Sequence, residues 1–125
     1  MVNGELLSSE MRREWNRPGF PVRTKQKFPT IPMSETSDSR GEKINLAAGL
    51  GIETWSGPND SYFAKGGHND WTGNLVICAD RQKRCVVMLA NSVRAEIIFP
   101  KIIEMTMGDT AYPWWWTYPS LHGDL

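Results

Sequence analysis

The sequence lacks the residues and runs that mark several common classes of protein. It has only two cysteines and two histidines, too few for a disulfide scaffold or a clustered metal site. No apolar run approaches the roughly 18 residues of a membrane-spanning helix, and no signal-peptide pattern opens the chain. These absences predict no cofactor, no metal and no membrane partner. They leave the localisation unknown, with the cytoplasm as the default.

An excess of either charge is also lacking. The chain contains 14 Lys and Arg against 14 Asp and Glu, for a formal net charge of +0. No overall field therefore favours binding to nucleic acid. One stretch, from Arg17 to Lys27, holds several basic residues and no acid. Its prolines are more typical of a solvated loop than of a binding patch.

What is present fits one globular domain. Hydrophobic residues make up 40% and charged residues 22% of the 125 positions, which is ordinary for a soluble chain with a modest core. Tryptophan is abundant, and Trp114 to Trp116 are consecutive. An exposed run of this kind would form a large apolar patch. We therefore expect the aromatic tail, residues 112–118, to pack back on the core.

The first third of the chain differs in pattern from the rest. A helical signal within residues 1–16 begins with Ser8 or Ser9 as its cap. A long proline-rich stretch without periodicity follows, which is unusual inside a compact domain, so we expect it to wrap over something or to be mobile. The sequence thus divides into 1–43, an N-terminal helix and extended arm, and 44–125, a sheet with a C-terminal helix and aromatic tail.

Four strand-like runs follow the arm. They are residues 46–55, 62–65, 75–79 and 85–90. The connections between them are short, which predicts an antiparallel meander. The first run is interrupted by glycines and places Leu50, Ile52 and Thr54 on one face. The last two runs are apolar on both faces, which is typical of central strands that are covered on both sides.

A helix is expected after the strands, at about residues 95–107. Apolar residues recur there at helical spacing, and Gly108 ends the pattern. Pro100 is compatible with the helix because it falls in the first turn, where N–H groups have no intrahelical partner. The predicted fold class is therefore α+β: a four-stranded antiparallel sheet at about 46–90, this helix packed on one face, and a short N-terminal helix.

The two cysteines flank a predicted hairpin turn. A closure centred on Arg81-Gln82 places Cys78 opposite Cys85. We expect two free thiols that pack as small apolar side chains.

One short segment, Lys65-Gly66-Gly67-His68, is the candidate binding site. A lysine at the end of a strand, followed by residues without Cβ atoms, places a cation beside bare backbone that a ligand can approach. The simpler interpretation is that the glycines only shape a hairpin and that Lys65 is solvated. On these residues alone the simpler interpretation is favoured, because so short a motif recurs by chance.

The order of elements around this segment resembles the C-terminal part of the serine β-lactamase and penicillin-binding-protein superfamily. The closest similarity is to β-lactamase-related hydrolases and esterases near class C. The resemblance covers nearly the whole chain through several segments in order. These are Asn3 to Ser8, Lys27-Phe28-Pro29, Gly49-Leu50-Gly51-Ile52, Phe63 to Trp71, Val86 to Ser92 and Pro113 to Trp116.

The resemblance implies roles for four residues. Lys65-Gly66-Gly67 matches the third active-site box of the family, usually K-T-G. It implies that Lys65 draws a substrate carboxylate or polarises the site, and that the glycine keeps the strand edge open. The backbone N–H of His68 would supply half of an oxyanion hole. Gly66 replaces the hydroxyl residue of the box, which removes one hydrogen bond to the substrate.

The other boxes of the family are missing. No Ser-x-x-Lys is present, since Ser39 to Lys43 is one residue too long and lies in a predicted loop. No Tyr-x-Asn or Ser-x-Asn is present either. The resemblance therefore implies a C-terminal fragment of a serine hydrolase that is inactive alone, and leaves open whether the chain is an enzyme. His68 and Asp70 are better explained as a polar turn than as a dyad, and His122 is expected in a frayed tail.

Two classes of function remain open at this point. In the first, the chain is the sheet part of an acyl-transfer hydrolase, and it acts on a small-molecule amide or ester only when an N-terminal chain complements it. The substrate, whether a β-lactam, a peptidoglycan stem or a simple ester, is not fixed by these motifs. In the second, the chain is a non-catalytic binding or oligomerisation module. The expected partners are a second copy or the complementing chain.

Overall fold

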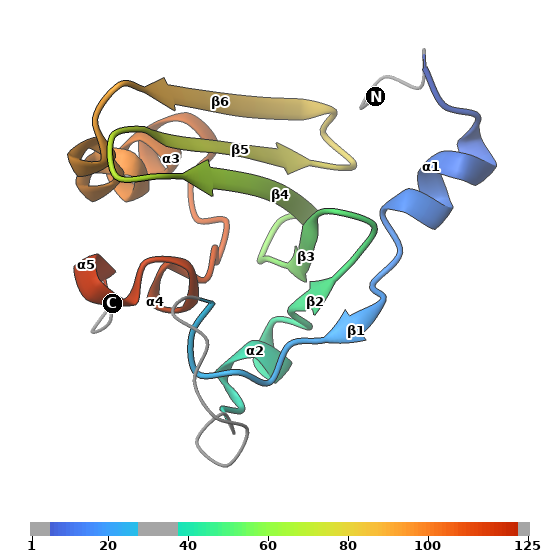
Figure 1. Cartoon of the computed structure of the whole chain (residues 1–125). Helices are drawn as coiled ribbons and strands as arrows, with labels where there is room; N and C mark the ends of the chain where they lie inside the picture. The colour runs from blue at the N-terminus through green and yellow to red at the C-terminus, as the bar shows by residue number, and fades with distance from the viewer. Residues whose placement is uncertain (1–5, 28–37, 123–125) are drawn as a thin grey trace.

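The computed structural model describes residues 6–27 and 38–122, and its fold class is α+β (Figure 1). One antiparallel sheet forms the frame, and short helices lie on one side of its longer strands. The strands are β1 (Phe20–Pro21), β2 (Ala47–Ala48), β3 (Glu53–Ser56), β4 (Ser61–His68), β5 (Gly73–Ala79) and β6 (Arg84–Ala90). The helices are α1 (Ser9–Trp15), α2 (Arg40–Lys43), the 3-10 helix η2 (Val93–Ile98), α3 (Phe99–Met107), α4 (Trp114–Thr117) and α5 (Pro119–His122).

The sheet has six strands in the order β1-β2-β3-β4-β5-β6, all antiparallel. The antiparallel meander is confirmed, whereas the predicted count of four strands is wrong. The two extra strands are only two residues long, and no periodicity can reveal so short an element. One of them, β1, comes from the proline-rich arm: Phe20 lies opposite Ala48.

The single strand expected at residues 46–55 is in fact two strands. Gly51 has a positive φ of 75°, and the N–H of Gly49 donates to the carbonyl of Ile52 at 2.8 Å. The chain therefore reverses between β2 and β3, which pair with each other through Ala48 and Glu53. Leu50 lies at the tip of this turn and is exposed, instead of sharing a strand face with Ile52.

The hairpin between β5 and β6 has the predicted register, with Cys78 opposite Cys85. The expectation of free thiols is wrong, because the two residues form a disulfide bond. Directly opposed residues of neighbouring antiparallel strands bring their Cβ atoms close together. A cross-strand bond is therefore the natural outcome of the predicted register once the thiols oxidise.

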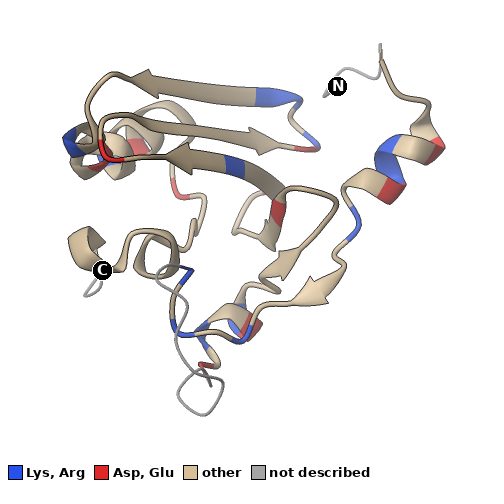
Figure 2. Ribbon diagram, viewed as in Figure 1, with Lys and Arg blue, Asp and Glu red and all other residues tan. Residues whose placement is uncertain are grey.

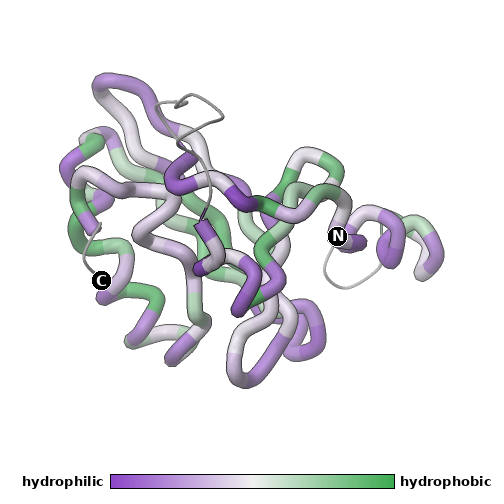
Figure 3. The backbone as a smooth tube through the Cα atoms, turned by 90° about the horizontal axis from the view of Figure 1, so that it is seen from below, coloured by the Kyte–Doolittle hydropathy of each residue, from purple (hydrophilic) through white to green (hydrophobic). Residues whose placement is uncertain are grey.

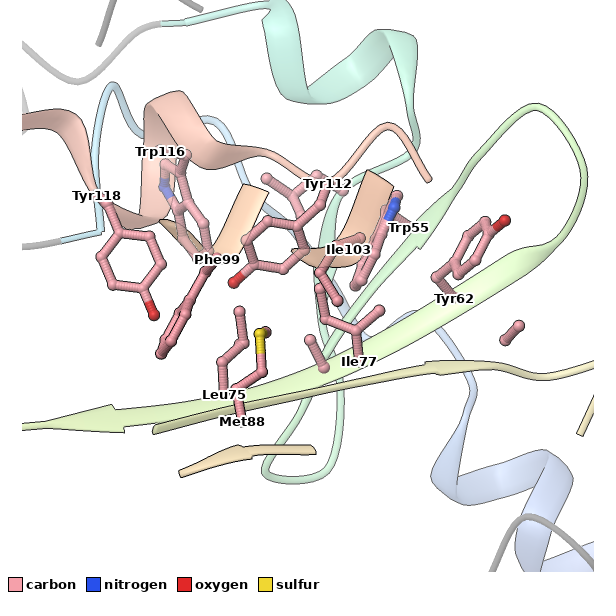
Figure 4. Packing of buried hydrophobic residues seen from close by; sticks show 13 residues of the cluster. Trp55, Tyr62, Leu75, Ile77, Met88, Phe99, Ile103, Tyr112, Trp116 and Tyr118 are labelled. Carbon is pink, nitrogen blue, oxygen red and sulfur yellow. The ribbon is translucent and has the colours of Figure 1, made fainter. Parts of the chain in front are cut away.

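The main core lies between one face of β3–β6 and the segments that follow β6 (Figure 4). Leu75 and Ile77 of β5 are almost fully buried against Phe99 and Ile103 of α3. This arrangement confirms that the C-terminal helix packs on one face of the sheet. The aromatic tail also packs back as predicted, and it contributes Tyr112, Trp116 and Tyr118 to the same cluster.

The closing helix starts later than expected. Residues 93–98 form the 3-10 helix η2, and the α-helix begins at Phe99, so that Pro100 lies in its first turn. Proline has no backbone N–H group, and this is tolerated in the first turn because N–H groups there have no intrahelical partner. At the other end of the chain, Ser8 is the cap of α1 and accepts the N–H of Met11 at 3.1 Å.

Only one face of the sheet is well covered. On the other face, Trp15 of α1 packs edge-on against Phe63 with ring centroids 5.0 Å apart, but the side chains of Val87 and Leu89 on β6 are exposed. The prediction that β6 is a central strand covered on both sides is therefore wrong, since β6 is the last strand of the sheet. Figure 1 shows α1 lying beyond the end of the β4–β6 sheet, away from β6.

Candidate functional site

The segment Lys65–His68 forms the end of β4 and extends past the strand that pairs with its beginning. β3 starts at Glu53, which lies opposite Ala64. On the other side, Lys65 to His68 pair with β5 up to Gly73. In the described part of the chain, this last half of β4 therefore has one free edge.

The direction of the backbone groups at this edge follows from the strand register. The carbonyl of Ser61 accepts the N–H of Asp80 at 2.9 Å, so the odd-numbered residues of β4 direct their backbone groups towards β5. Backbone groups alternate along an antiparallel strand. Gly66 and His68 consequently direct their N–H and C=O groups to the free edge.

A shallow cavity of about 280 Å³ adjoins the free edge. All four predicted site residues line it, and three further residues come from elsewhere in the chain. The lining residues are Lys27, Lys65, Gly66, Gly67, His68, Thr117 and Tyr118. The cavity thus combines two lysines with bare backbone donors, which is a suitable environment for an anion.

Lys27 was not predicted as a site residue, and three contacts hold it at the wall. The backbone N–H of Lys27 donates to the Trp116 carbonyl at 2.8 Å. Its Nζ atom pairs with Glu53 Oε1 and lies 5.5 Å from the Trp116 ring centroid. Glu53 is buried, and its second oxygen, Oε2, has no hydrogen-bond partner among the described residues. No signal in the sequence links Lys27 to Lys65.

The two glycines leave room at the edge. A Cβ at Gly67 would contact nothing within 4 Å, and one at Gly66 would lie 3.9 Å from the Tyr118 hydroxyl oxygen. There is room for a Cβ atom at both positions, so packing does not require glycine at either of them. Their effect is to expose the main chain to the cavity. Burial raises the pKa of the Tyr118 phenol, so this hydroxyl stays protonated beside Gly66.

His68 forms a pair that the sequence did not indicate. Its Nδ1 lies 3.2 Å from Oε1 of Glu96, whose side chain is buried. Gly73 makes this contact possible, because a Cβ there would lie 2.8 Å from Cγ of Glu96. Burial raises the pKa of the Glu96 carboxyl, and the neighbouring His68 only partly opposes this effect. Asp70, the other candidate partner of His68, is exposed.

His122 is buried rather than frayed. Its Nε2 lies 3.2 Å from the Glu96 carbonyl oxygen, and its ring packs near those of Trp114 and Tyr118. This contact ties α5 to η2. The residue thus has a structural role next to the cavity, and it does not line the cavity itself.

Among the described residues, no serine or cysteine lines the cavity beside Lys65. Ser39, the serine nearest in spacing to a Ser-x-x-Lys pattern, is the last residue before the short helix α2 and occupies its N-terminal cap position. Within the described residues, no three His, Cys, Asp or Glu side chains gather into a possible metal site, and no helix is long and apolar enough to cross a bilayer.

Comparison of the chain with family models, curated proteins and solved structures found no match. The site must therefore be interpreted from its own geometry. That geometry is a free strand edge with two outward N–H groups, two lysines at the wall, and an exposed His68 paired with the buried Glu96.

Proposed function

We propose that the chain is the sheet part of a β-lactamase-related serine hydrolase and supplies the K-T-G-like wall of its active site. The observation that carries the proposal is the free end of β4, where Lys65 stands beside the outward N–H groups of Gly66 and His68. In this role Lys65 attracts the carboxylate of an acyl substrate. The His68 N–H stabilises the charge that develops on the carbonyl oxygen.

In this proposal the nucleophile comes from a complementing chain. Acyl transfer needs an activated hydroxyl or thiol. Among the described residues no serine or cysteine lines the cavity, and the hydroxyl of Thr117 donates to the Tyr112 hydroxyl instead. The proposed substrate class is an amide or ester with an acidic group. Its chemistry proceeds only when a complementing chain brings the serine, its lysine and the second box to this edge.

A direct test is the binding of a carboxylate-bearing acyl substrate to the isolated chain. We expect a cephalosporin to shift the backbone amide resonances of Gly66 and His68 in a titration followed by NMR. Lys65→Ala should weaken this binding roughly 10- to 150-fold, since a charge-assisted hydrogen bond contributes roughly 1.5–3 kcal/mol. The matched control is Lys101→Ala, because Lys101 pairs only with Glu104 on α3, far from this edge in sequence. Equal effects of the two variants would contradict the proposal.

A second candidate function is a non-catalytic oligomerisation module. The observation that favours it is the exposed apolar outer face of β6. Hydrolysis restored by a complementing chain would support the first candidate. Stable self-association of a chain that no such complement activates would support the second.

A further inference from the structure

The outer edge of β6 is free along its whole length in the part of the chain that the structure describes. Cys85 and Cys78 have Cα atoms 4.1 Å apart, a spacing typical of a pair whose backbone groups point away from each other. Cys85, Val87 and Leu89 therefore direct their N–H and C=O groups away from β5. These groups form a row of donors and acceptors along the open edge.

The same three residues also present exposed side chains. Val87 is 61% and Leu89 79% exposed, and Cys85 is exposed as well. Natural edge strands usually carry prolines, bulges or charges that prevent pairing. Residues 85–90 contain none of these charges or prolines, and Figure 2 shows charge on β6 only at its start, which is Arg84.

The helix next to this edge has exposed apolar residues of its own. α3 packs against β6, and Met105 on it is largely exposed, as is Ile98 just before its first residue. Figure 3 shows hydrophilic residues in the helix near the N-terminus as well as in loops, alternating with hydrophobic ones along the chain.

We propose that the occupant of this edge is a second copy of the chain, which pairs β6 with β6 antiparallel about a two-fold axis through Val87. Val87 then lies opposite Val87 of the other copy, and Cys85 lies opposite Leu89. The two sheets become one continuous sheet. The proposal rests on the second candidate function above and is independent of the site at Lys65.

Self-complementarity is the argument for a second copy. In an antiparallel pair, only residues whose backbone groups point outward can exchange hydrogen bonds, so positions 85, 87 and 89 must pair with one another. The register centred on Val87 uses all three and overlaps the entire strand. It also places Arg84 opposite Ala90, which keeps the two arginines apart. An isologous contact of this kind closes as a dimer and does not propagate.

Charge substitutions at Val87 test both the occupant and the register. Sedimentation of the purified wild-type chain should show a dimer. Val87→Lys and Val87→Glu should each be monomeric, because two like charges then lie directly opposite. An equimolar mixture of the two variants should form the dimer again. Leu50→Lys is the control, since Leu50 is 64% exposed at the β2–β3 turn, and it should remain dimeric.

Cross-linking provides a second measurement that does not depend on charge. In Val87→Cys, the two introduced thiols lie in a directly opposed pair, within the distance that a disulfide can span. A covalent dimer should appear on a non-reducing gel for Val87→Cys and not for Leu50→Cys. Circular dichroism establishes that each variant is folded.

Three results would overturn the proposal. The first is a folded wild-type chain that stays monomeric at high concentration. This holds also if the β6 edge of the monomer binds a strand of a different polypeptide. The second is a dimer that Val87→Lys leaves intact. The third is a mixture of Val87→Lys and Val87→Glu that does not associate. Equal effects of Lys65→Ala and Lys101→Ala on cephalosporin binding would contradict the function proposed for Lys65 and leave this dimer unchanged, so the two proposals fail separately.

Discussion

At the scale of single residues, one buried carboxylate organises the turns beside β4. The side chain of Asp60 is fully buried and accepts the backbone N–H groups of Ser61, Arg81 and Gln82 at 2.8–3.0 Å. Burial alone would raise the pKa of this carboxyl, but the three backbone donors together with the Arg81 side chain lower it below its ordinary value. Asp60 thereby joins the β3–β4 turn to the β5–β6 turn.

Asp60→Ala should therefore destabilise the protein by about 3 kcal/mol, because three backbone donors lose their acceptor in a buried position. The lowered pKa also predicts that the contribution of Asp60 is complete above the unfolded-state pKa and is lost as the pH falls through the folded-state value. Urea unfolding of wild type and Asp60→Ala at several pH values checks this. An acid loss of stability that is equal in both proteins would exclude Asp60 as its source.

The raised pKa of Glu96 predicts the opposite pH dependence of stability. Its folded-state pKa is raised, chiefly by burial, so the folded protein binds more protons than the unfolded chain above pH 4.5, the ordinary value. The stability that Glu96 contributes must therefore fall as the pH rises through this window. Glu96→Gln should remove that fall while keeping a polar group near Nδ1 of His68. His68 and His122 face the same carboxyl, so the unfolding free energies are compared with those of His68→Gln as a control.

The sequence could indicate only part of this residue network. Lys65 to His68 are contiguous and follow an apolar strand, so their grouping was predictable from local pattern. Tertiary packing brings three further residues to this end of β4, namely Lys27, Glu96 and Tyr118. No local sequence pattern predicts that they lie there. The pair formed by His68 and Glu96 spans 28 residues and depends on the absence of a side chain at Gly73.

At the scale of elements, the β5–β6 hairpin was predictable because its pattern is strong and local. Two apolar runs are separated by a short polar turn, and the register follows from closing that turn symmetrically. The split of residues 46–55 into β2 and β3 was not predictable in the same way, because the two strands are held by pairing with β1 and β4. Strands that are this short depend on their neighbours rather than on intrinsic propensity.

The disulfide of this hairpin should contribute a modest stability. Its cysteines are 7 residues apart, and the chain-entropy model gives about 2–3 kcal/mol for so short a loop. Urea unfolding with and without a reductant should show a difference of this size in the wild type and none in the double variant Cys78→Ser, Cys85→Ser. Mass spectrometry under non-reducing conditions identifies the bonded pair. A wild-type midpoint that does not respond to reductant, with the bond demonstrably broken, would contradict the prediction.

At the scale of the whole molecule, the free end of β4 and the edge of β6 lie on opposite edges of the β4–β6 part of the sheet. The free end of β4 is polar and basic and adjoins a cavity, whereas the edge of β6 is apolar and adjoins none of the charged site residues. The first suits a small anionic ligand and the second suits another strand. A dimer through β6 would therefore leave the site at Lys65 accessible.

The isolated chain, as monomer or dimer, should not hydrolyse activated esters or β-lactams through a covalent intermediate. In the part of the chain that the structure describes, the wall of the cavity beside Lys65 has lysines and backbone donors but no serine or cysteine. Enzymes that have lost their nucleophile but keep a complete binding site retain some rate enhancement from charge stabilisation. Here the cavity is shallow, so a substrate would not be held in a geometry close to attack.

The check is a chromogenic ester and a chromogenic cephalosporin incubated with the purified chain, together with a serine-directed covalent probe followed by intact mass. We expect hydrolysis at the buffer rate and no mass increase, with Lys65→Ala indistinguishable from wild type in both readouts. The cephalosporin should nevertheless shift the Gly66 and His68 amides in the wild type, because binding needs only the wall that this chain provides. A stoichiometric acyl adduct on any serine would show that the chain has its own nucleophile. The role proposed for an external serine would then be wrong, even if Lys65 were essential to the reaction.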